Sequence, residues 1–356
     1  MPVHRHDGYL QVIDRAEISV LGGGRTRRGR QMFSDHFFKL FLFLALGLLC
    51  VAERPLAAEK SKITIGYSTT GPTAVGLWTA KDIGAFDKYG IDPALIFISS
   101  SPVMVPALIG GDVQAAIAGA NAVIAAAIGG AAIVSIASLA NRPYLRLWVH
   151  PEVNRVEELR GKTFGVSRFG ATTDNLTRIL LRRVGLENSV NVRQLGGTLE
   201  VGLAFRHRQI DAAVLATLRA DVPHRILIEL ADSGIQYSMG QLVVSRDFLR
   251  RAPELLDNIM RAYLEGVAVL RDPTQKDRVM KTVGRYTRLK EMKAVEEIYS
   301  DAAKYVDRVP RVEAEPVAAS LEMMGKKGLP IETFADNSII DRLVREGFID
   351  QLYKKR

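Results

Sequence analysis

Cysteine is almost absent from this chain of 356 residues, which has only Cys50. Cys50 lies inside an apolar N-terminal run, and no thiol follows it. The rest of the chain therefore cannot form a disulfide framework, a cysteine-based zinc site or a thiol nucleophile. This scarcity fits a protein that is exported from the cytoplasm, where a lone thiol is liable to oxidation.

Recognisable enzyme motifs are also missing. The sequence has neither the phosphate-binding pattern G-x-x-x-x-G-K-[ST] nor the zinc-binding pattern H-E-x-x-H. Its G-x-S-x-x-G segments differ in spacing from the nucleophile elbow G-x-S-x-G. The histidines beyond the first 58 residues, His150, His207 and His224, are scattered. We therefore expect no catalytic residues, no metal site and no cofactor, although a triad assembled in space stays open.

Basic residues outnumber acidic residues by 48 to 39, which gives a formal net charge of +9. Part of this excess is local, because four arginines cluster between positions 25 and 30. Elsewhere both signs are interspersed, as on an ordinary solvated surface. The aromatic-plus-basic motifs of RNA-binding modules do not occur. We therefore expect a small-molecule ligand and no nucleic-acid partner.

The apolar run LFLFLALGLLCVA at 40–52 has the length of a signal-peptide core and is short for a membrane span. Basic residues precede this run, and Ala58 offers a small residue at which a signal peptidase could cut. We therefore expect residues 1–58 to be a leader and the mature protein to be periplasmic. Met32 is a candidate for the true start.

Two other interpretations of this N-terminus stay open. One is a retained anchor helix. The other is a lipid anchor attached through Cys50, although Leu48 and Leu49 match poorly the small residues that lipid attachment requires.

Two short patterns recur in the same order along the chain. ITIGYSTTG at 63–71 and TFGVSRFG at 163–170 both close a β-prone run with G-x-S-x-x-G, at an offset of 99 residues. VQAAIA at 113–118 resembles IDAAVLA at 210–216, at an offset of 97. This repetition predicts two similar lobes.

Apolar runs and helical patterns alternate through the first 250 residues. Strands are expected at 63–67, 94–98, 113–118, 133–138, 163–167, 190–195, 210–215 and 226–230. Helices are expected at 74–88, 102–109, 121–128, 173–184 and 200–206, and later at 253–271, 276–286, 290–304, 313–326 and 336–354. The pattern predicts an α/β protein with two lobes, each with a mostly parallel sheet flanked by helices, a hinge between them and a helical C-terminal part.

In parallel sheets, ligands bind beyond the carboxyl ends of the strands. The loops at these ends are rich in hydroxyls and glycine, and several lead into helices, whose first N–H groups are free. The candidate ligand-binding residues are Ser68, Thr69, Thr70, Trp78, Ser99, Ser100, Asn121, Ser167, Arg168, Thr172, Thr173 and Thr217. Such a pocket favours an anionic or polar ligand.

Each candidate also has a structural alternative. Serine and threonine before helices are often N-caps, and Asn121 could be one. Trp78 could belong to the core. Arg168 is the most specific candidate, because a guanidinium can hold an oxyanion through two hydrogen bonds, but it could also be a surface arginine.

The segment WTAKDIGAFDKYGID at 78–92 fits the pattern A-x-D-x-G-x-F-x-x-x-G-[IL]. Together with ALIGGDVQAAIAGANAVIAAAIGG at 107–130, LRGK at 159–162 and QIDA at 209–212, it resembles the nitrate/sulfonate/taurine class of periplasmic substrate-binding proteins. That class shares the type II periplasmic-binding-protein fold with thiamine-pyrimidine synthases. Two departures are Arg168, in a loop that usually lacks arginine, and Leu215-Ala216-Thr217, where many relatives have an aromatic residue and a proline.

The resemblance implies two lobes that close on a ligand. It implies that residues 59–145 plus 247–356 form the first lobe and residues 146–246 the second, with hinges near Asn141–Val149 and Gln241–Arg246. It also implies a monomer that delivers a small organic anion, a sulfonate or a carboxylate, to an ABC transporter permease in the inner membrane. An enzyme of the thiamine-pyrimidine-synthase type and a ligand-binding sensory module are the alternatives.

Overall fold

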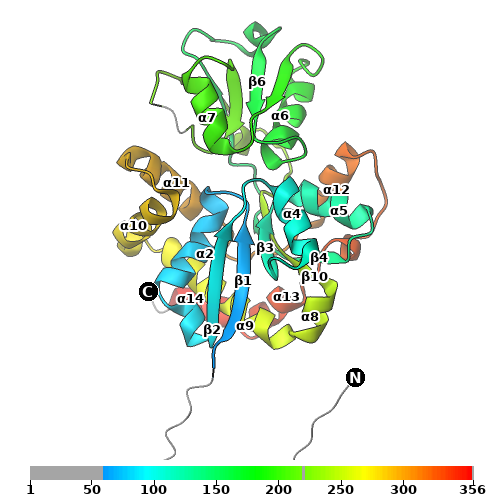
Figure 1. Cartoon of the computed structure of the whole chain (residues 1–356), viewed down its shortest axis with the longest axis vertical. Coiled ribbons are helices and arrows are strands. Elements are labelled where there is room, and N and C mark those ends of the chain that lie inside the picture. The colour runs from blue at the N-terminus through cyan, green and yellow to red at the C-terminus, as the bar shows by residue number, and fades with distance from the viewer. Residues whose placement is uncertain (1–58, 219–220, 355–356) are drawn as a thin grey trace, which may run out of the picture. The chain divides into compact units, whose positions relative to one another are not determined.

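Ten strands of the described residues form two separate five-stranded sheets. The computed structural model describes residues 59–218 and 221–354. The strand order is β2-β1-β3-β10-β4 in the first sheet and β7-β6-β8-β5-β9 in the second. We call each sheet with its helices a lobe, the first and the second (Figure 1).

The first sheet has four strands in one direction and one against them. β1 pairs in parallel with β2 and β3, whereas β10 is antiparallel to β3 and β4. Every residue of β3 and β4 is buried, which is typical of sheets covered by helices. The strands are β1 (Ser61–Tyr67), β2 (Ile91–Phe97), β3 (Ala115–Ala118), β4 (Ile133–Ala140) and β10 (Gly240–Ser245).

The helices of the first lobe come from both ends of the described chain. They are α2 (Pro72–Asp82), α3 (Ala85–Lys88), α4 (Ser101–Gly110), α5 (Ala120–Ile128), α8 (Arg246–Arg251), α9 (Pro253–Leu270), α10 (Lys276–Thr287), α11 (Met292–Tyr305), α12 (Ala314–Met323), α13 (Ser338–Arg345) and α14 (Phe348–Lys354), with 3₁₀ turns at Pro273–Gln275 and Ile331–Thr333. α9 buries Ile259, Tyr263 and Val267, which lie four positions apart and so share one helix face. α2 crosses this helix so closely that a methyl group on Gly266 would lie 2.3 Å from the carbonyl oxygen of Gly76.

The second lobe repeats the same arrangement on a smaller scale. β6 pairs in parallel with β7 and β8, and β5 is antiparallel to β8 and β9. In Figure 1, α6 and α7 stand on either side of β6. The elements are β5 (Arg146–Val149), β6 (Thr163–Val166), α6 (Thr172–Arg183), β7 (Asn191–Gln194), α7 (Thr198–Arg206), β8 (Ala212–Leu215) and β9 (Arg225–Glu229), with 3₁₀ turns at Val156–Leu159 and Leu230–Asp232.

The predicted fold class is confirmed: two sheets flanked by helices, with a helical C-terminal part. All eight expected strands are present, and the repeated patterns fall on β1 and β6, and on β3 and β8, which hold the same places in the two sheets. Two short antiparallel strands, β5 and β10, were not expected. β10 lies within the range predicted for the second lobe but pairs in the first sheet, and the lobe limits themselves stay a prediction.

The chain passes between the sheets at residues 141–145 and 230–239. The first of these overlaps a predicted hinge, and the second precedes the other predicted hinge, which largely coincides with β10. A third connection is an ion cluster: Arg146 of β5 donates two hydrogen bonds of 2.7 Å to the carboxylate of Asp301 in α11.

The predictions for the N-terminus, which are the signal peptide, the cut after Ala58, the start at Met32 and the lipid anchor at Cys50, lie outside the described residues. Among the helices of the described ranges, none is long and apolar enough to cross a membrane.

Candidate functional site

A cavity of about 550 Å³ is lined by residues from both lobes. From the first lobe come the loops that follow β1, β2 and β3, and from the second lobe the loops that follow β6, β7 and β8. These are the carboxyl ends of parallel strands, where the fold leaves loops free to meet a ligand.

The structure brings eight of the twelve predicted residues together around this cavity. They are Ser68, Thr69, Thr70, Ser99, Ser100, Ser167, Thr172 and Thr173. The Ser101 hydroxyl accepts a hydrogen bond of 2.8 Å from the Gly119 amide and lies 3.2 Å from the Ser68 hydroxyl. The three loops of the first lobe are thereby fixed to one another. Whether the eight residues bind a ligand stays a prediction.

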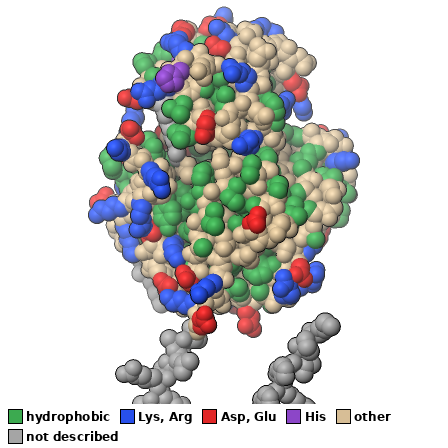
Figure 2. All heavy atoms as spheres, viewed as in Figure 1, with side chains coloured by type: hydrophobic (Ala, Val, Ile, Leu, Met, Phe, Trp, Pro, Cys, Tyr) green, Lys and Arg blue, Asp and Glu red, His purple; other side chains and the backbone are tan. Residues whose placement is uncertain are grey.

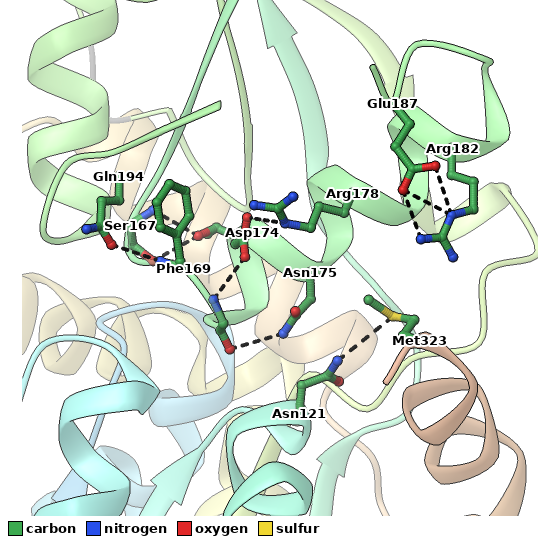
Figure 3. Close-up of polar contacts among 12 residues, drawn as sticks. Asn121, Ser167, Phe169, Asp174, Asn175, Arg178, Arg182, Glu187, Gln194 and Met323 are labelled. Atoms are coloured by element: carbon green, nitrogen blue, oxygen red, sulfur yellow. Dashed lines mark hydrogen bonds and ion pairs between the residues drawn. The ribbon is translucent and has the colours of Figure 1, made fainter. Parts of the chain in front are cut away.

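The other four predicted residues do not line the cavity. Trp78 is fully buried and stacks on Tyr286 with 5.1 Å between ring centroids. Asn121 is buried, accepts a hydrogen bond of 2.9 Å from Ser320 and donates to the sulfur of Met323, so it attaches α12 to α5 (Figure 3). Trp78 therefore belongs to the core, as its structural alternative had it. Asn121 is not the N-cap that the sequence suggested, because α5 begins at Ala120 and its N-cap is Gly119.

Arg168 and Thr217 are half-buried in loops of the second lobe. The Nε of Arg168 and the hydroxyl of Thr217 have no hydrogen-bond partner among the described residues. The loop that carries Arg168 is held by its neighbours, since the Phe169 amide donates to Gln194 and the Gly170 amide to Asp174 (Figure 3).

Five helices begin at the cavity, and the residue before each of them lines it. These N-cap residues are Gly71, Ser100, Gly119, Ala171 and Gly197, before α2, α4, α5, α6 and α7. In the described structure none of the five side chains accepts a hydrogen bond from the first turn. Glycine and alanine have no side-chain acceptor, so the positive helix ends and the first-turn N–H groups, except at Pro72 and Pro102, which have none, stay available to a ligand.

Ser100 is the one cap residue with a hydroxyl, and it is held in an unusual conformation. Its φ is +76°, a region that residues other than glycine rarely adopt. The side chain is 6% exposed, and its hydroxyl has no hydrogen-bond partner among the described residues. Buried hydroxyls without a partner are rare and need an explanation. A ligand in the cavity would supply the missing hydrogen-bond partner.

Two charged side chains line the cavity: Arg288 and Glu200. Arg288 follows α10 and has a φ of +55°, and Glu200 lies in the first turn of α7. Burial raises the pKa of Tyr67 above its ordinary value, and the Arg288 guanidinium partly opposes this rise. Arg288 and Tyr67 both line the cavity. Sequence reasoning missed Arg288, because no motif marks a single arginine among the C-terminal helices.

The lobes approach each other closely beside the cavity. A methyl group on Gly119 of the first lobe would lie 2.4 Å from the Thr172 hydroxyl of the second. One on Gly197 of the second lobe would lie 2.7 Å from the Ser99 hydroxyl of the first. Only glycine permits such contacts without a shift. Figure 2 shows one face of the molecule, where charged side chains of both signs are scattered among apolar and uncharged surface.

This architecture, a cavity between two α/β lobes, is the fold of periplasmic binding proteins. The alkanesulfonate-binding protein SsuA of Xanthomonas axonopodis pv. citri has it: the two structures share 17% identity, with 80% of this chain and 98% of that one covered and a TM-score of 0.62. The nitrate-binding protein NrtA of Synechocystis shares 13% identity over 81% of this chain and 88% of its own, with a TM-score of 0.60. At these identities the likeness concerns the fold.

The chain belongs to the NMT1/THI5-like family, whose model matches residues 72–276. A protein of Brucella abortus strain 2308 that is named as a binding protein is 29% identical over 203 residues, which are 54% of this chain and 60% of that protein. The chain thus spans about 60% of the length of the curated relatives it matches. The predicted resemblance to periplasmic substrate-binding proteins is confirmed at the level of family and fold.

Proposed function

We propose that this protein is an extracytoplasmic solute-binding receptor, which captures a small organic anion, a sulfonate or a carboxylate, and delivers it to an ABC-type importer. The observation that carries the proposal is the set of five helices that begin at one cavity without side-chain caps. Each helix start favours negative charge, and together they can surround an acid group with N–H donors.

The lining of the cavity supports binding rather than catalysis. Hydroxyl groups predominate among its polar side chains, and the described lining residues include no histidine, cysteine or lysine. Hydroxyls and amides can replace the water around an anion without reacting with it. Among the described lining side chains Glu200 could act as a general base, but neither a histidine nor a lysine is there to activate a hydroxyl as a nucleophile.

The closeness of the lobes supports a mechanism by closure. Ligand would bind to one lobe while the cleft is open, and rotation at residues 141–145 and 230–239 would bring the other lobe onto it. The contact of Gly119 with Thr172 would limit this movement. Delivery to a permease is proposed by analogy with fold relatives named for sulfonate and nitrate binding, and export by the N-terminal run at 40–52.

Isothermal titration calorimetry with matched ligands tests the proposal. Ethanesulfonate, acetate, benzoate and nitrate are compared with the neutral acetamide and benzamide and the cation ethylammonium. We expect binding of at least one anion and none of its neutral or cationic partners. Equal binding of benzoate and benzamide, or a preference for ethylammonium, would contradict an anion site.

A negative charge introduced at the start of a helix tests whether the anion binds there. Thr198 lines the cavity as the first residue of α7, and Thr198→Asp is expected to weaken anion binding about tenfold or more through repulsion. Ala314→Asp is the matched control, because Ala314 is also the first residue of a helix but does not line the cavity. Equal effects of the two substitutions would place the anion elsewhere.

A further inference from the structure

We propose that the cavity selects a planar aromatic acid, whose acid group is bound by Arg288 and whose ring lies against Phe97, Tyr67 and Tyr286. This inference rests on the proposed function and names the chemical class of its ligand. It assigns the anion contact to Arg288, a residue of the first lobe, in place of Arg168.

Four aromatic rings form a row of contacts, and three of them line the cavity. Phe97 and Tyr67 lie 5.5 Å apart, Tyr67 meets Trp78 edge-on at 5.7 Å, and Trp78 is stacked on Tyr286 with an angle of 3° between the rings. Trp78 is completely buried and supports the row from behind, whereas the other three rings line the cavity.

Phe97 indicates that this row of rings is made for contact. Phe97 is the last residue of β2, the strand that pairs with β1. It is large and apolar, yet it is 46% exposed. An aromatic ring exposed beside a rigid row of rings loses contact with water when a second planar ring stacks on it. Aromatic pairs of this kind are favoured over aliphatic contacts of equal area.

Arg288 lines the same cavity as three of these rings. It follows Tyr286 by two residues, and its guanidinium is near enough to oppose the rise in the pKa of Tyr67. In the described part of the chain Arg288 forms no ion pair within 4.0 Å. A planar guanidinium can hold a carboxylate or sulfonate through two parallel hydrogen bonds.

The backbone conformation of Arg288 is energetically unfavourable for a residue other than glycine. Its φ of +55° is the conformation in which helices commonly end with glycine. An arginine there is strained, and strain of this kind is found at functional sites. It follows that Arg288→Gly removes the guanidinium while it relieves the backbone, so loss of binding can be separated from loss of folding.

The single carboxylate of the lining favours a ligand with one acid group. Glu200 contributes a negative charge from the second lobe. Arg288 is the one positively charged side chain among the described lining residues. A second acid group on the ring would lack a cation and be repelled by Glu200. Benzoate is therefore expected to bind more tightly than the dianion terephthalate, and Glu200→Gln to reduce this preference.

Calorimetry with wild type and Arg288→Gly tests the assignment, with benzoate, benzenesulfonate, cyclohexanecarboxylate and ethanesulfonate as probes. We expect benzoate or benzenesulfonate to bind wild type about threefold to tenfold more tightly than cyclohexanecarboxylate, from ring stacking. Arg288→Gly should weaken aromatic-acid binding about tenfold or more, the effect of losing a hydrogen-bonded charge, without lowering the melting temperature. Lys290→Gly, at a nearby exposed lysine that does not line the cavity, is the control and should leave affinity unchanged.

Other results would overturn the inference and leave the proposed function standing. These are tighter binding of cyclohexanecarboxylate than of benzoate, or binding of ethanesulfonate that is sensitive to Thr198→Asp but not to Arg288→Gly. A loss of affinity in Arg168→Ala but not in Arg288→Gly would return the anion contact to Arg168. Failure of every anion to bind would overturn both proposals.

Discussion

The two lobes have the same strand order but different surroundings. In the first lobe, α9 to α14 follow the sheet in sequence, and several of them bury residues in one core with α2 and β1. The second lobe has only α6, α7 and two 3₁₀ turns beside its sheet. The first lobe also supplies the aromatic row and Arg288, whereas the second supplies hydroxyls, two uncapped helix starts and Glu200. In the proposed function, the first lobe would therefore present rings and a cation to the ligand, and the smaller second lobe would complete the set of hydrogen-bond donors.

The ion cluster at Arg146 is expected to give the largest effect, because it joins the second lobe to a helix of the first. Its side chain is 12% exposed and contacts Asp301, Glu297 and Glu229. Arg146→Met would leave these carboxylates without their cation, and should lower the free energy of unfolding by about 3–5 kcal/mol. Urea denaturation measures this.

The surface pair Arg182 with Glu187, which lies within the second lobe, provides the control. Arg182→Met is expected to cost less than about 1 kcal/mol. If Arg146→Met costs no more than Arg182→Met, the cluster does not join the lobes energetically.

Glu297, in the same cluster, makes stability depend on pH. Burial raises its pKa from 4.5 to about 7, against the attraction of Arg146. The folded state therefore holds this proton more tightly than the unfolded state, and stability falls as pH rises from about 4.5 to about 7. In Glu297→Gln this part of the fall, about 3 kcal/mol, should disappear.

Urea denaturation at pH 5 and pH 8 measures the difference. Glu296→Gln is the control, since Glu296 is exposed on the same helix and pairs only with Lys276 among the described residues. It should show the same pH dependence as wild type. A Glu297→Gln protein that still loses as much stability as wild type would show that Glu297 titrates normally.

The contact between Gly119 and Thr172 offers a way to hold the lobes apart. A methyl group at Gly119 would lie 2.4 Å from the Thr172 hydroxyl, so Gly119→Ala should disfavour closure and weaken ligand binding about tenfold, or about 1.4 kcal/mol. Titration calorimetry measures the affinity, and small-angle scattering should show a larger radius of gyration with ligand than for wild type.

The double variant Gly119→Ala with Thr172→Ala tests the cause. Removal of the hydroxyl makes room for the new methyl group, so part of the affinity should return. Equal affinities of wild type and Gly119→Ala would mean that the ligand binds without this closure.

The smallest expected effect is the difference between the equivalent glycines of β1 and β6. A methyl group on Gly66 would meet the flexible end of Met104, whereas one on Gly165 would meet Ile210, Leu195 and Val201 together. We expect Gly165→Ala to cost about 2 kcal/mol and Gly66→Ala about 1 kcal/mol, because a thioether moves more easily than three branched side chains. Thermal denaturation ranks the stabilities of the two variants. A greater loss of stability in Gly66→Ala than in Gly165→Ala would refute the explanation.

Local pattern was enough to predict the repeated βα units, since the apolar period that distinguishes a strand from a helix lies within each element. It did not predict β5 and β10, which are short, antiparallel and lie in segments expected to be hinges. The rule for strand ends selected loops that line the cavity. It could not place Asn121, whose partner Ser320 lies 199 positions away, or find Arg288, which reaches the cavity only through the packing of α10.

A crystal structure with the tightest-binding anion of the panel tests the central claim most directly. We predict that the acid group lies in the cavity, within hydrogen-bond distance of helix-start amides from both lobes. An acid group bound outside the cavity, or inside it without contact to any of the five helix starts, would contradict the account.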